Sequence, residues 1–165
     1  MASRLLATYL NDHYAASVGA VELARRTAGS NRGTSYGAAL EALAAEIEED
    51  RQALRRIMQS LGIGADRAKG AIAWAAEKLG RFKLNGQLTG YSPLSRLEEL
   101  EILELGVTGK LLLWEALGRS TPDGIRKDEL TRLADRARDQ RRRLEILRLD
   151  AAGEALDPNG LRGGS

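Results

Sequence analysis

A chain of 165 residues without cysteine has no disulfide or thiolate metal site, and its length suffices for one domain with a substantial buried core. The hydrophobic share of 43% and the charged share of 29% are typical of a globular protein and exclude an intrinsically disordered chain. Because 25 Lys and Arg face 23 Asp and Glu, the formal net charge is only +2, which disfavours a general affinity for nucleic acid.

Two helices are predicted first, from apolar residues spaced three and four apart. One extends from about Ser3 to Thr27 and ends in a glycine-rich turn. The other begins after Thr34, a predicted N-cap, and ends before Gly62. Because the turn between them is short, these helices are expected to form an antiparallel hairpin. The expected buried stripe of the first helix is Leu6, Tyr9, His13, Ala16, Ala20 and Leu23.

A shorter, alanine-rich helix is predicted from about Asp66 to Leu84. One face of it combines an aromatic residue with a row of cations: Arg67, Trp74, Lys78 and Arg81. Such a face suits a nucleic acid or an anionic membrane. The preferred interpretation is that Trp74 covers the end of a helical bundle while the cations remain in water, so neither partner is expected.

Two further long helices follow the glycine-rich segment 85–91. The first begins either at Ser92 with Pro93 or at Ser95 with a capping box, and Gly118 is expected to end it. The last helix extends from about Ile125 to Ala152. Four long helices joined by short, long and short connections predict an all-α four-helix bundle, with one long crossover that carries a short extra helix.

The bundle is expected to form a single domain over residues 1–154, followed by a flexible tail over 155–165. The first apolar stretch is interrupted by Asn11, Asp12 and His13, before the apolar core of a signal peptide would be complete. No stretch approaches 18 apolar residues, the length that a membrane-spanning helix requires. A cytoplasmic location is therefore expected.

Each of the four long stripes carries one polar residue near its middle: His13, Asp50, Glu104 and Gln140. In an antiparallel hairpin, residues at the same height have numbers that add up to a constant set by the turn. This relation places His13 level with Asp50, and Glu104 level with Gln140, to within about one helical turn. The sequence therefore predicts a polar layer halfway along an apolar core.

Two interpretations of this layer remain open. Burying a charged group costs several kcal/mol unless it is paired, so the four residues are expected to contact one another or a ligand. In the first interpretation they form a hydrogen-bonded network that fixes the register of the helices. In the second, His13, Asp50 and Glu104 bind a metal ion, with Glu49 as a reserve ligand.

The predicted wiring resembles the ferritin-like superfamily over about residues 3 to 152. In its di-iron members two helices each supply a Glu, and the other two each supply a Glu-x-x-His motif. Glu104 stands where a helix with a single Glu supplies its ligand, whereas Ala53 and Arg143 lie three residues after Asp50 and Gln140, where the motif has histidine. The resemblance therefore implies a bacterial member with an incomplete di-iron motif. Iron or another divalent metal is the cofactor that it implies.

The sequence favours a non-catalytic interaction or structural protein that needs no cofactor and whose protein partner it does not identify. The alternative is a metal-binding protein or a metal-dependent oxidoreductase of the ferritin-like type, using His13, Asp50 and Glu104. The penultimate long helix is apolar on more than one side and carries Ile102, Leu103, Leu105, Leu112 and Leu113. A helix of this kind is either central or covered by a second subunit, so a homodimer is predicted.

Overall fold

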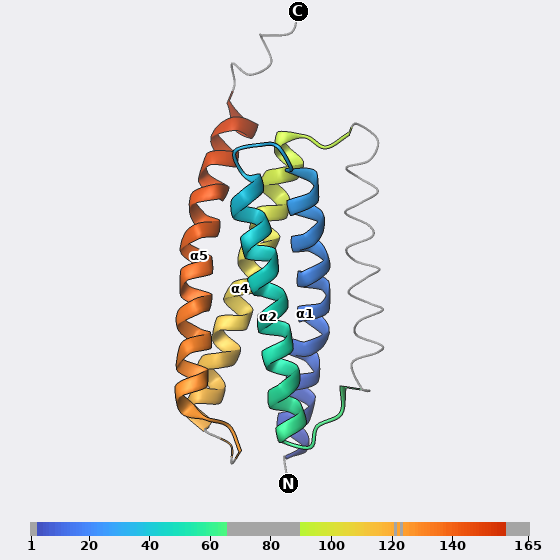
Figure 1. The fold of residues 1–165 in the computed structure, drawn as a ribbon, viewed down its shortest axis with the longest axis vertical. Coiled ribbons are helices and arrows are strands. Elements are labelled where there is room, and N and C mark those ends of the chain that lie inside the picture. The colour runs from blue at the N-terminus through green and yellow to red at the C-terminus, as the bar shows by residue number, and fades with distance from the viewer. Residues whose placement is uncertain (1–2, 66–89, 121, 123, 158–165) are drawn as a thin grey trace, which may run out of the picture.

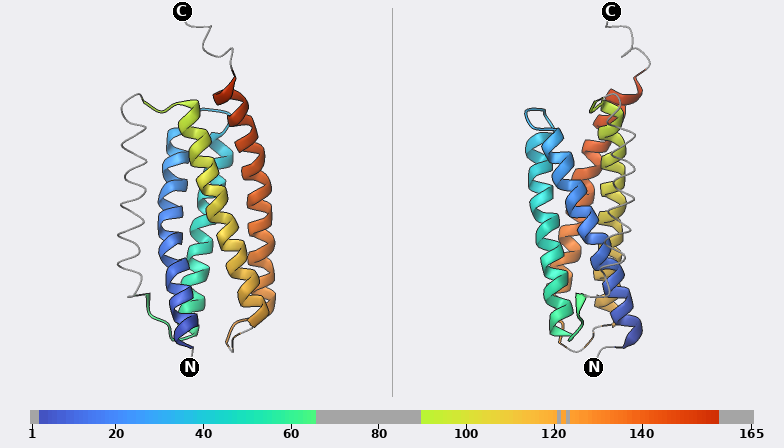
Figure 2. Two further views of the ribbon diagram at one scale, coloured as in Figure 1. Left: turned by 180° about the vertical axis from the view of Figure 1, so that it is seen from behind. Right: turned by 90° about the vertical axis from the view of Figure 1, so that its right-hand side faces the viewer.

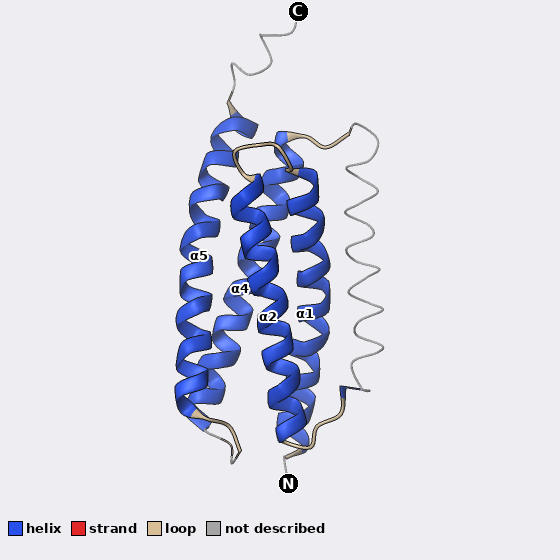
Figure 3. Ribbon diagram, viewed as in Figure 1, coloured by secondary structure: helices blue, strands red, loops and turns tan. Residues whose placement is uncertain are grey.

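The computed structural model describes residues 3–65, 90–120, 122 and 124–157, and the predicted all-α class is confirmed (Figure 1). The four helices are α1, Arg4–Ser30; α2, Gly37–Ser60; α4, Pro93–Ser120; and α5, Lys127–Leu156. Within these ranges there is no strand (Figure 3), and none of the helices has both the length and the apolar character needed to cross a bilayer. The helix predicted over 66–84, with Arg67, Trp74, Lys78 and Arg81, lies outside the described residues.

The four helices lie side by side as two antiparallel hairpins, α1 with α2 and α4 with α5 (Figure 2). Helix α1 also packs against α4. Helix α2 ends at one end of the bundle and α4 starts at the opposite end, and residues 61–92 separate them in the sequence (Figure 1). The short, long and short connections that the sequence predicts are therefore present.

Local hydrogen bonds set most of the helix ends. The Ser3 hydroxyl accepts a hydrogen bond from the backbone N–H of Leu6 at 3.1 Å and caps α1. Ser92 does the same for the N–H of Ser95 at 3.1 Å, which supports the start at Ser92 and Pro93. The predicted N-cap Thr34 is wrong, because its hydroxyl bonds within the turn and Tyr36 precedes α2 without a side-chain cap.

Two predicted ends fall short of the observed ones. Helix α4 continues through Gly118 to Ser120, and α5 extends to Leu156, inside the segment predicted to be a flexible tail. A single glycine near the end of a helix costs only about 1 kcal/mol, which side-chain packing readily offsets. Most of the predicted tail, 158–165, lies outside the described residues.

In the first half of α1 the buried stripe is rotated from the predicted one by a single residue, about 100° around the helix, whereas Leu23 is buried as predicted. Tyr9 and Ala16 are exposed, and His13 is half-buried. The residues of α1 that fill the core include Leu10, Tyr14, Val21, Ala24 and Ala28. Alanine occurs on several faces of this helix, so its apolar pattern is compatible with either phase.

Gly37 is the first residue of α2 and packs against the preceding turn. A Cβ atom at this position would lie 2.8 Å from the backbone oxygen of Asn31, so Gly37→Ala is expected to destabilise the protein by about 1–3 kcal/mol. Gly153 in α5 has no atom within 4 Å of the equivalent position, and Gly153→Ala is expected to stabilise by up to about 1 kcal/mol. Urea denaturation of both variants measures the difference, and equal effects would contradict the close approach.

Candidate functional site

Asp50 lies in the middle of α2 and is the most deeply buried acidic side chain of the described residues, with only 1% of its surface exposed. One carboxylate oxygen, Oδ2, accepts hydrogen bonds from the Lys110 ammonium group and from Gln140 Nε2, the latter at 3.1 Å. The other oxygen, Oδ1, accepts a hydrogen bond from the Arg136 guanidinium group. Asp50 thus ties α2 to both α4 and α5.

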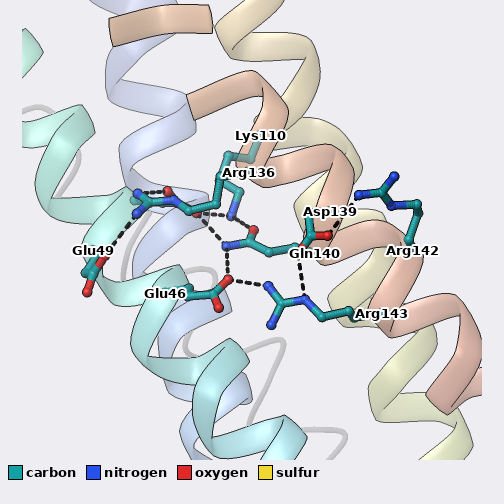
Figure 4. A network of polar contacts seen from close by, with 9 residues as sticks. Glu46, Glu49, Lys110, Arg136, Asp139, Gln140, Arg142 and Arg143 are labelled. Carbon is teal, nitrogen blue, oxygen red and sulfur yellow. Dashed lines mark hydrogen bonds and ion pairs between the residues drawn. The ribbon is translucent and has the colours of Figure 1, made fainter. Parts of the chain in front are cut away.

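Gln140, which is 0% exposed, connects Asp50 to a second carboxylate. Its Nε2 donates to Glu46 Oε2 at 3.1 Å as well as to Asp50, and its Oε1 accepts from Lys110 (Figure 4). Glu46 also accepts a hydrogen bond from Arg143 Nη2 at 2.5 Å. Both amide hydrogens of Gln140 and its carbonyl oxygen are therefore bonded inside the bundle.

The network becomes more exposed towards the outer faces of α2 and α5. Arg136 donates through Nη1 to Glu49 Oε2 at 2.9 Å, and Glu49 is 64% exposed at its side chain. Arg143 Nε lies 2.8 Å from Asp139 Oδ2, and Arg142 donates to Asp139 Oδ1 at 2.9 Å. We call the whole set the charged layer; its members are Glu46, Glu49, Asp50, Lys110, Arg136, Asp139, Gln140, Arg142 and Arg143 (Figure 4).

The charges of this layer balance, but burial still affects the proton equilibria of its members. Burial lowers the pKa of Lys110 below its usual range, although the carboxylate of Asp50 acts in the opposite direction. Burial tends to raise the pKa of Glu46, but hydrogen bonds from Arg143 and Gln140 outweigh it and the net direction is downward. Removal of Asp50 would leave the largely buried ammonium group of Lys110 without a counter-charge.

The structure brings only two members of the predicted four-residue layer together. Asp50 and Gln140 contact each other as expected. His13 instead packs edge-on against Tyr9, with ring centroids 4.6 Å apart. Glu104 lies towards the outside of the bundle, where its Oε2 is 3.5 Å from Nε of Arg148 in α5.

The displacement of these two residues has a simple geometric reason. The rotation of α1 carries His13 towards the edge of the core. On α4 the neighbouring residue Leu103 is buried where Glu104 was expected, and the polar residue that α4 sends to the layer is Lys110.

The four candidate metal ligands do not form a ligand cluster. Among the described residues no group of three or more His, Asp or Glu side chains lies close enough to hold a metal ion. Asp50 is surrounded by cationic donors, Glu49 pairs with Arg136, and Glu104 pairs with Arg148. Ammonium and guanidinium groups occupy the positions next to these carboxylates that a metal ion would need.

The sequence interpretation missed the cationic half of the layer. Arg136 and Arg143 lie four residues before and three residues after Gln140, so all three share one face of α5. The spacing around Gln140 is the signal that points to a basic face of α5 directed at the acidic residues of α2.

A cavity of about 240 Å³ lies beside this layer, between α1, α2 and α4. Six residues with polar groups contribute to its lining: His13, Ser17, Asp50, Arg51, Lys110 and Trp114. The half-buried His13 thus faces this cavity instead of the charged layer. Burial lowers the pKa of its imidazole, with Asp12 acting in the opposite direction.

Comparisons with known proteins do not assign this arrangement to a family: no family model, curated protein or solved structure matches the chain.

Proposed function

We propose that the protein is a non-catalytic helical scaffold that acts through association with a second copy of itself, and that its charged layer has a structural role. The observation that carries this proposal is the pairing of Asp50. Both of its carboxylate oxygens accept hydrogen bonds from cations, and the side chain is almost completely buried. A general base needs a carboxylate within reach of a substrate proton, which this arrangement does not offer.

A structural role accounts for the geometry of the layer. A buried ion pair adds little net stability compared with apolar residues, but breaking one is costly. The hydrogen bonds of Asp50 and Gln140 form only when α2, α4 and α5 are at the correct height and rotation. The charged layer therefore penalises bundles with shifted helices, as buried polar residues do in coiled coils.

The surface that supports association is the outer face of α4 and α5. Leu105 and Leu112 lie seven residues apart on α4 and are 73% and 57% exposed. On α5, Ile146 is 62% exposed and lines the same surface hollow as Leu105. We call these three residues, Leu105, Leu112 and Ile146, the apolar face. Exposed apolar side chains grouped on a folded protein are typical of an interaction surface.

The charges around the apolar face favour a second copy as the partner. Exposed acidic residues, including Glu98 and Glu101, lie on α4, whereas exposed arginines, including Arg138 and Arg142, lie on α5. In a dimer with two-fold symmetry, α4 of one copy faces α5 of the other, and each contact occurs twice. Acidic and basic residues then meet around an apolar centre, as in known interfaces.

We also propose that the bundle is related in architecture to the ferritin-like superfamily. The antiparallel pairing of α1 with α2 and of α4 with α5, and the long connection between the two pairs, support this relationship. The proposal concerns the scaffold alone, because the candidate ligands do not cluster.

Sedimentation velocity tests the proposed association. The wild-type chain is expected to sediment as a dimer at tens of micromolar, and the double variant Leu112→Asp/Ile146→Asp as a monomer, because two carboxylates in the apolar face would have to be desolvated. Leu5→Asp, an equally drastic change at an exposed leucine of α1, is expected to leave the dimer intact. Circular dichroism verifies that both variants are folded. A monomeric wild type, or dissociation caused by Leu5→Asp, would contradict the proposal.

A further inference from the structure

The cavity between α1, α2 and α4 has the properties of a small binding site. Its lining comes from three helices and is mostly aliphatic, with side chains that include Ala16, Ala20, Ile47, Leu54, Leu103 and Val107. Binding sites for small molecules usually combine such an apolar lining with a few polar groups that orient the ligand. Here two of the polar lining residues, Asp50 and Lys110, also belong to the charged layer.

The volume limits the size of the molecule that fits. An engineered apolar protein cavity of about 150 Å³ takes up benzene. A cavity of about 240 Å³ therefore accommodates one six-membered ring with a short substituent. Most drug-sized molecules need about 300–1,000 Å³ and are too large.

Trp114 provides a donor that lacks an acceptor. Its side chain is 1% exposed, and its indole Nε1 is buried without a hydrogen-bond partner in the described part of the chain. Buried N–H groups in native proteins nearly always have an acceptor, so an unpaired one calls for an explanation. Because Trp114 lines the cavity, a molecule bound there can supply the missing acceptor.

The electrostatic balance around the cavity favours an uncharged molecule. Asp50 and Lys110 also line the cavity, but they are bonded to each other and to Gln140. The pKa of His13 is lowered by burial, so its imidazole is neutral at pH 7. Arg51 also lines the cavity, but its guanidinium group is paired with the carboxylate of Glu48. The described lining residues therefore offer no unpaired charge to compensate for an ionised group, whose desolvation would be unfavourable.

We propose that this cavity binds a small neutral molecule with an apolar body of about one ring and a single hydrogen-bond acceptor. The acceptor receives a hydrogen bond from the indole N–H of Trp114. The site borders the proposed dimer interface, because Leu105 of the apolar face also lines the cavity, whereas Leu112 and Ile146, the two residues changed in the monomeric variant, do not. It would give the scaffold a ligand-binding activity in addition to self-association.

The indole N–H resonance of Trp114 in the ¹⁵N-labelled full-length chain reports on the proposed hydrogen bond. Trp74→Phe identifies this resonance, because the chain has two tryptophans. Acetophenone, a neutral ketone with one ring, is expected to cause a saturable downfield shift. Ethylbenzene, which has no acceptor, is expected to shift backbone amides around Ala20 and Val107 but not the indole resonance downfield. Benzoate, which is charged at pH 7, is expected to bind at least tenfold more weakly than acetophenone.

Variants of α1 provide the matched test. Ala20→Leu fills the cavity and is expected to weaken acetophenone binding at least tenfold, whereas Ala7→Leu on the same helix lies outside the cavity and is expected to have no effect. Ala16→Leu at the exposed edge of the cavity is a second filling variant, in case Ala20→Leu does not fold. The monomeric variant Leu112→Asp/Ile146→Asp is expected to bind acetophenone like the wild type, which separates this proposal from the proposed association.

Four results would each overturn the proposal. The first is the absence of a saturable indole shift in the wild type, and the second is unchanged acetophenone binding when the cavity is filled. The third is a downfield shift of the indole resonance with ethylbenzene as large as that with acetophenone, which would show that the shift does not depend on a hydrogen-bond acceptor. The fourth is benzoate binding as tight as that of acetophenone, which would show that the site prefers, or tolerates, an anion.

Discussion

Replacing Asp50 with alanine is expected to lower the free energy of unfolding by about 3–5 kcal/mol, the usual cost of removing one partner from a buried ion pair. The change leaves Lys110 and Gln140 without their carboxylate and takes from Arg136 its innermost contact. The ammonium group of Lys110 is affected most, because its side chain is largely buried and, within the described part of the chain, its one other hydrogen bond is to Gln140. Urea denaturation followed by circular dichroism measures the loss.

Glu49→Ala is the matched control for Asp50→Ala. Glu49 is also an acidic residue of α2 that pairs with Arg136, but it is largely exposed, so its loss is expected to cost less than about 1 kcal/mol. If Asp50→Ala costs no more than Glu49→Ala, the charged layer does not hold the helices together.

Replacing the centre of the charged layer with apolar residues distinguishes its effect on the free energy of unfolding from its effect on the register of the helices. The triple variant Asp50→Leu/Lys110→Met/Gln140→Leu is expected to be about as stable as the wild type, since apolar side chains of similar volume often replace buried ion pairs without loss. If the layer sets the register, the amide resonances of this variant broaden or double while its unfolding free energy stays high. Sharp, single resonances would contradict the proposed role of the layer.

Leu144→Ala is expected to destabilise the protein by about 2–5 kcal/mol, because it leaves a cavity in the fully buried core of α5. In a protein of this size each kcal/mol lowers the melting temperature by about 2–4 °C, so calorimetry detects the change easily. Leu144 follows Gln140 by one helical turn, so its loss also loosens the packing next to the charged layer.

The matched control is Leu156→Ala near the end of the same helix, where the side chain is exposed. The identical change is expected there to cost less than about 0.5 kcal/mol. Similar costs at the two positions would show that the orientation of α5 in the bundle differs from the one described.

The number, order and approximate ends of the long helices can be predicted from the sequence because the interactions that determine them are local. The start of α4 depends on a hydroxyl of Ser92 that bonds three residues along the chain. Turn residues such as Gly33 and Gly124, both with positive φ, interrupt the helices where the sequence predicts a turn. Each signal lies within a few residues of the feature that it specifies.

The rotation of α1 about its own axis could not be predicted from such local signals. Shifting the stripe by one residue exchanges Tyr9 and His13 for Leu10 and Tyr14, and apolar or aromatic residues occur in both sets. Only packing against α2 and α4 decides between them, and it buries Leu10 and Tyr14. The same ambiguity moved His13 out of the predicted layer.

The periodic pattern is enough to predict that Asp50 and Gln140 lie on the core side of their helices, since each interrupts an apolar stripe in the middle of a helix. The residues that they contact depend on how the helices pack against one another. Asp50 and Arg136 are 86 residues apart in the chain, and their meeting depends on how α2 and α5 are turned towards each other. Lysine and arginine reach several ångströms from their backbone, so a periodic pattern cannot assign their charged ends to the core or to the surface.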